Sequence, residues 1–79
     1  MARALPRRRG RPTRRARGAG VRIREERLRA GLSQGELGAR LGVRPGTVAR
    51  WETGSAVPLV AALRLVGVLP GLALAELAQ

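Results

Sequence analysis

Arginine is the residue type through which this chain could do chemistry. The sequence has 16 arginines and five glutamates, which give a formal net charge of +11. His, Cys, Asp, Asn, Lys and Tyr do not occur, so most of the usual nucleophiles, general bases and metal ligands are missing. We therefore expect no enzyme activity, no cofactor and no metal site. Guanidinium groups stay charged and suit phosphate oxygens and guanine edges, which favours nucleic acid as the class of partner.

The charge is unevenly distributed along a chain of 79 residues, a length that suits one small domain. Residues 1–20 hold eight arginines and no acid, interrupted by glycines and prolines, so we predict a disordered arginine-rich arm. Residues 21–79 carry the other eight arginines and all five glutamates. They are predicted to form the folded domain.

Capping signals and the spacing of apolar residues predict an all-α domain with no strands. Ser33 followed three residues later by Glu36 is the pattern of a capping box, and Pro45 suits the first position of a helix. The five predicted helices span residues 21–30, 34–41, 45–53, 59–69 and 72–78.

Buried faces can be predicted for two of these helices. In the first, we expect Ile23, Arg27 and Ala30 to form the inner stripe. Trp51 is the sole aromatic residue and follows Val48 at helical spacing, so we expect it in the core and not stacked on a base.

The second and third predicted helices are joined by three residues, 42–44, which is the arrangement of a helix-turn-helix. The sequence around this connection resembles the XRE-type, lambda-repressor-like DNA-binding domains, over about residues 21–69. The residues that carry the resemblance are Leu32-Ser33-Gln34, Glu36-Leu37, Leu41-Gly42-Val43, Thr47-Val48, Trp51-Glu52, Gly54 and Pro58. This resemblance implies a compact five-helix fold whose third helix reads bases in the major groove.

The resemblance also assigns roles to individual residues. Gln34 matches the position that clamps a DNA phosphate, and Arg27 and Glu52 match a structural ion pair. An arginine can bond both acceptors of guanine, so Arg44 and Arg50 are the expected base readers and predict G·C pairs in the operator. The full set of expected DNA contacts is Gln34, Arg44, Pro45, Gly46, Thr47 and Arg50. Because Pro45 and Gly46 replace the long polar side chains of better-known repressors, base specificity is expected to be modest.

The arm contains Arg7-Arg8-Arg9-Gly10-Arg11-Pro12, which resembles an AT-hook, a segment that lies in the minor groove of A·T-rich DNA. Arg9 and Arg11 would be the inserted side chains. A basic tail with nonspecific phosphate affinity is the alternative interpretation, and a true start at Val21 is a third. The arm residues expected to contact DNA are Arg7, Arg8, Arg9, Arg11, Arg14 and Arg15.

The C-terminal segment is more apolar than so small a domain can bury, so we expect a partner to cover part of it. Arg64, Pro70-Gly71 and Glu76 interrupt it and disfavour a membrane span. A homodimer would cover this surface and match a palindromic operator. The leading hypothesis is thus a sequence-specific transcriptional regulator, cytoplasmic and nucleoid-associated in a bacterium or phage. The alternatives are an antitoxin that binds a protein toxin through its C-terminal helices, and a weakly specific architectural protein driven by the arm.

Overall fold

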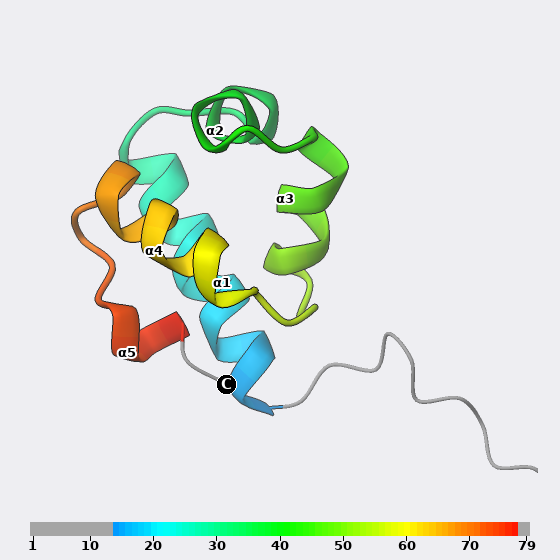
Figure 1. Cartoon of the computed structure of the whole chain (residues 1–79), viewed down its shortest axis with the longest axis vertical. Helices are drawn as coiled ribbons and strands as arrows, with labels where there is room; N and C mark the ends of the chain where they lie inside the picture. The colour runs from blue at the N-terminus through cyan, green and yellow to red at the C-terminus, as the bar shows by residue number, and fades with distance from the viewer. Residues whose placement is uncertain (1–13, 78–79) are drawn as a thin grey trace, which may run out of the picture.

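Five helices make up the part of the chain that the structure describes. The structure is a computed structural model, and it describes the backbone of residues 14–77 and the side chains of residues 17–77. The helices are α1 (Arg14–Arg29), α2 (Gln34–Leu41), α3 (Pro45–Glu52), α4 (Leu59–Val68) and α5 (Leu74–Leu77). No strand occurs in residues 14–77, so the prediction of an all-α fold is confirmed. In Figure 1, α1 lies near the middle of the fold and α2 crosses one end of the fold. Helix α3 contacts both α1 and α2.

The turn between α2 and α3 follows from local sequence signals. The Ser33 hydroxyl accepts from the backbone N–H of Glu36, and the Glu36 carboxylate accepts from the backbone N–H of Ser33, which completes the predicted capping box. Gly42 ends α2 with a φ of 75°, a left-handed conformation that favours glycine. Pro45 then occupies the start of α3. The second predicted helix, residues 34–41, therefore has the bounds that the structure shows.

The core is apolar, and all five helices contribute to it. Val48 and Trp51 of α3 are both buried, with 5% of Trp51 exposed, as predicted. The core consists of Ala19, Ile23, Leu32, Leu37, Leu41, Val48, Trp51, Val57, Ala62, Leu65, Leu69, Leu72 and Leu77.

The start of α1 differs from the prediction. The helix begins at Arg14, seven residues before the expected start at Val21, so residues 14–20 do not belong to a disordered arm. Ala19 is buried, and a Cβ on Gly20 would lie 2.7 Å from the carbonyl oxygen of Glu52. Small residues at these positions let α1 pack directly on the backbone of α3. This contact keeps residues 14–20 helical, although their composition predicts disorder.

Several predicted arm contacts cannot be placed. Arg7, Arg8, Arg9 and Arg11, with the AT-hook-like segment, lie outside the described residues. Arg14 and Arg15 belong to α1, but their side chains lie outside the description as well.

The inner stripe of α1 also differs from the expected one. Ile23 and Arg27 are buried, but Ala30 is exposed and follows the last residue of the helix. Glu26 is buried in its place, with 6% exposed. A buried carboxylate was not expected, and it is tolerated because arginines neutralise it.

The C-terminal helices are shorter than predicted. α3 and α4 each end one residue early, and α5 begins at Leu74, two residues after the expected start. The reason for the late start of α5 is a turn at Pro70-Gly71 in which the Leu72 N–H donates to the Leu69 carbonyl. None of the helices within residues 14–77 is both long enough and apolar enough to cross a membrane.

Candidate nucleic-acid interface

The residues expected to contact bases come together on the outer surface of α3. Arg44, Pro45, Gly46 and Arg50 are exposed, and Thr47 is half-buried. Arg44 is the N-cap of α3 and the other four lie within the helix, whose buried residues are Val48 and Trp51. The result is an exposed surface at α3 that carries the two guanidinium groups of Arg44 and Arg50.

The start of α2 lies beside this surface. A Cβ on Gly35 would lie 3.7 Å from Cγ of Pro45, so the N-terminal ends of α2 and α3 are neighbours. Backbone N–H groups at a helix N-terminus attract anions. Gln34 is half-buried here, and its side-chain amide donates to Oε1 of Glu52 at 3.1 Å. This hydrogen bond was not predicted, and it fixes the direction of the Gln34 side chain.

Arg27 and Glu52 meet, as the family resemblance implies. Nε and Nη2 of Arg27 donate to the two carboxylate oxygens of Glu52 at 2.6 and 3.1 Å. Nη1 of Arg27 donates to the Leu32 carbonyl at 2.8 Å. Only 9% of the Arg27 side chain and 4% of the Glu52 side chain are exposed. The bonds to Glu52 raise the pKa of Arg27 above its ordinary value, so the guanidinium group stays charged.

Glu25, Glu26 and Glu76 form ion pairs with arginines of α1, away from the outer surface of α3. Arg22 binds Glu25, Glu26 and Glu76 at 2.9, 3.3 and 2.5 Å, which joins α1 to α5. Arg29 binds Glu26 at 2.7 Å. The spacing of Arg22 with Glu25 and Glu26 on one helix was a usable signal for part of this network. Its contact with Glu76, 54 residues away, had no signal in the sequence.

Arg44 and Arg50 keep their charges free for a ligand. Within residues 17–77, neither side chain forms an ion pair or a hydrogen bond. An uncompensated guanidinium group on a convex helix is well suited to phosphate or guanine.

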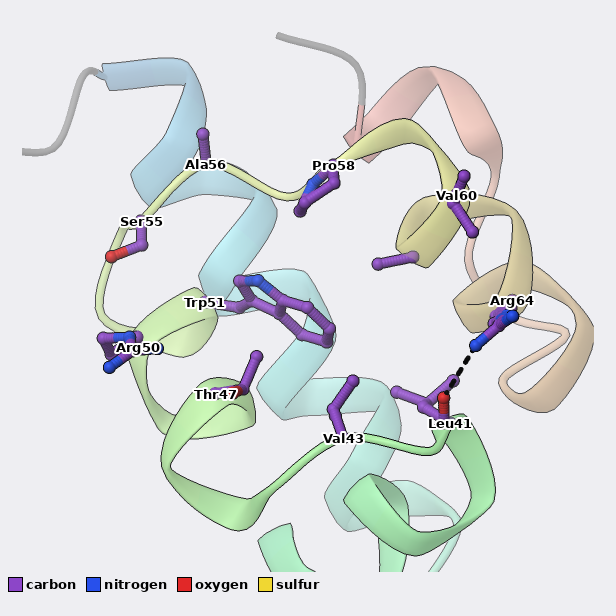
Figure 2. Close-up of a pocket in the computed structure, with 11 residues that line it drawn as sticks. Leu41, Val43, Thr47, Arg50, Trp51, Ser55, Ala56, Pro58, Val60 and Arg64 are labelled. Carbon is purple, nitrogen blue, oxygen red and sulfur yellow. Dashed lines mark hydrogen bonds between the residues drawn. The ribbon is translucent and has the colours of Figure 1, made fainter.

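A groove runs along each side of α3. One has a volume of about 440 Å³ and lies between α3 and α4 (Figure 2). The other, of about 480 Å³, lies between α1 and α3 and is lined by residues that include Gln34 and Arg24. The described residues contain no cluster of three or more side chains that could hold a metal ion.

Comparison with known families agrees with this geometry. A family model described as Helix-turn-helix matches residues 23–77. The chain therefore belongs to the helix-turn-helix family of the XRE type, whose members bind double-stranded DNA and regulate transcription. Searches of curated proteins and of solved structures found no match.

Proposed function

We propose that the protein is a sequence-specific transcriptional regulator that places α3 in the major groove. The observation that supports this most strongly is the pair of exposed arginines without ion-pair partners, Arg44 at the N-cap of α3 and Arg50 within the helix. The major groove admits one helix, and either arginine can bond O6 and N7 of a guanine. Thr47 lies between them and can donate its hydroxyl to a base or a phosphate.

Gln34 would position a DNA strand beside the recognition helix. Its Nε2 carries two hydrogens, and only one is used by Glu52. The second hydrogen and the N–H groups at the start of α2 are the donors that we assign to a phosphate oxygen. Glu52 would then hold the clamp in place while it pairs with Arg27.

The protein is further proposed to act as a homodimer on a palindromic operator. Leu59, Val60 and Leu63 of α4 are 67%, 61% and 54% exposed, and Leu74 of α5 is also exposed. Apolar side chains gathered at such exposure favour burial against a second copy. Two recognition helices about one duplex turn apart would read two half-sites.

An antitoxin is the second candidate, supported by the same apolar surface of α4. In that case a protein toxin would cover Leu59, Val60 and Leu63. The oligomeric state separates the two candidates. Leu63→Glu should convert a dimer to monomers in sedimentation velocity, whereas Leu28→Glu, at similar exposure on α1, should not. A wild-type chain that sediments as a monomer would favour the antitoxin.

The decisive experiment is selection of bound sequences from a random duplex library at about 150 mM salt. The full chain would be compared with a chain that begins at Arg14, because a start at Val21 would remove the buried Ala19 and Gly20. A palindromic motif with G·C pairs, shared by both chains, is the expected result. No motif, or only A·T-rich tracts that disappear with the arm, would contradict base reading and favour the architectural alternative.

A further inference from the structure

The groove between α3 and α4 has the size and the lining of a small-molecule site. Apolar side chains line most of it, among them Leu41, Val43, Trp51, Pro58, Val60 and Ala61. Figure 2 shows the Trp51 indole in the middle of the groove, between Thr47 and Pro58. Its volume of about 440 Å³ lies within the usual range of small-molecule sites, roughly 300 to 1,000 Å³.

The polar groups of this groove are cationic or neutral. Arg50 and Arg64 lie at opposite ends in Figure 2, and the hydroxyls of Thr47 and Ser55 complete the lining. No carboxylate lines it, whereas Glu25 and Glu52 line the groove on the other side of α3. Charge therefore distinguishes the two grooves, and an anion is complementary to the first.

Arg64 is oriented for such an anion by the fold. Its Nη1 donates to the Leu41 carbonyl at 3.2 Å, and within residues 17–77 this guanidinium forms no ion pair. Guanidinium has five N–H donors in a fixed plane, so most remain free for a carboxylate. Because the hydrogen bond to Leu41 already restrains the Arg64 side chain, this side chain would lose little further conformational entropy when a ligand binds.

We propose that this groove binds a small amphipathic carboxylate. The carboxylate would pair with Arg64, and the hydrocarbon body would lie against Pro58 and Ala61, beside Trp51. Since Thr47 and Arg50 line the same groove, the ligand would compete with DNA. This second part rests on the proposed role of α3 in the major groove.

Binding can be tested on the full chain through Trp51, its sole aromatic residue. Octanoate should change the tryptophan emission saturably. Acetate lacks the apolar body and 1-octanol lacks the charge, so each should bind about tenfold more weakly or not at all. An emission change that is linear in octanoate, or equal for 1-octanol, would overturn the proposal.

Two matched pairs of variants locate the site. Arg64→Gln should weaken octanoate binding about tenfold, whereas Arg40→Gln, which removes an exposed charge from α2, should leave it unchanged. Ala61→Leu should fill the groove and abolish binding, whereas Ala49→Leu makes the same change in the other groove and should not. Circular dichroism checks folding, so the Ala61 pair decides the matter if Arg64→Gln unfolds. Equal binding by Ala61→Leu and Ala49→Leu would show that the ligand lies elsewhere.

The regulatory part has its own readout. Octanoate should raise the apparent Kd for a selected DNA duplex in the wild type and leave it unchanged in Ala61→Leu. Saturable octanoate binding without this shift would retain the ligand site and overturn the competition. The fluorescence titration contains no DNA, so failure of the proposed DNA mode would not affect the test for the ligand site.

Discussion

Arg50 projects from α3 with no partner in the described chain, so its charge is available for a guanine. We predict that Arg50→Ala costs about 1–3 kcal/mol on the selected operator and relaxes the preference at one base pair. Fluorescence anisotropy with single-base operator variants would measure this. Arg40→Ala removes the same charge from α2 and should leave the base preference unchanged. Equal losses for Arg50→Ala on operator and random duplex would contradict base reading.

Glu52 accepts hydrogen bonds from Arg27 and from Gln34 in a nearly buried position. Glu52→Ala would leave the charge of Arg27 buried without its acidic partner, so we predict a loss of about 3–5 kcal/mol in the free energy of unfolding. Urea unfolding followed by circular dichroism measures this loss. In the double variant with Arg27→Ala, the loss should be smaller than the sum of the two single losses. Strictly additive losses would show that the two side chains do not depend on each other.

At the scale of elements, the packing of α1 on α3 depends on Gly20. A Cβ there would meet the backbone of Trp51 and Glu52, so Gly20→Ala should destabilise the fold by about 1–3 kcal/mol through overpacking. Gly18 lies in the same helix with open space around it, and Gly18→Ala should stabilise the helix by up to about 1 kcal/mol. Thermal unfolding of both variants measures these effects. If both substitutions stabilised the protein, residues 14–20 would not pack on α3.

The position of α5 on α1 depends on Glu76. Hydrogen bonds from Arg22 and from the Ala73 N–H lower the pKa of Glu76 below its ordinary value of 4.5. The stability from these contacts is therefore present above pH 4.5 and disappears as the pH falls through the lower pKa of the folded state. Glu76→Gln should accordingly lower the Tm near neutral pH and have a smaller effect at about pH 3. Glu25→Gln, which removes a more exposed partner of Arg22, should lower the neutral Tm less. An equal effect of Glu76→Gln at both pH values would contradict this assignment.

At the scale of the whole molecule, the charge of the chain is concentrated at its N-terminal end, where residues 1–13 carry five of the 16 arginines. Removing them should weaken binding to all duplexes and reduce the slope of log Kd against log salt by about 0.9 for each phosphate that these arginines neutralise. Titrations at several salt concentrations, on operator and on random DNA, measure both effects. An unchanged slope would show that these arginines bind no phosphate.

The helix-turn-helix could be predicted closely because its signals are local. The bounds of α2, the capping box of Ser33 and Glu36, and the burial of Trp51 all depend on residues a few positions apart. The predicted start of α1 was wrong because the first turns of this helix pack on α3, which lies far along the chain. The backbone of α3 comes so close there that only a glycine fits at position 20. Family resemblance supplied the pair of Arg27 and Glu52, which spacing alone would not have identified.

The sequence by itself determined the helical class and the turn at Gly42, because helix caps and apolar periodicity act within a few residues. The residues expected to contact bases came from the family resemblance. Only the tertiary structure decided which charges are neutralised. It brings Glu76 to Arg22 and Gln34 to Glu52, and it leaves Arg44 and Arg50 without acidic partners in the described chain. It also forms the groove where Arg64 of α4 lies with Trp51 of α3. Such contacts depend on how helices distant in sequence pack, and no local pattern encodes that packing.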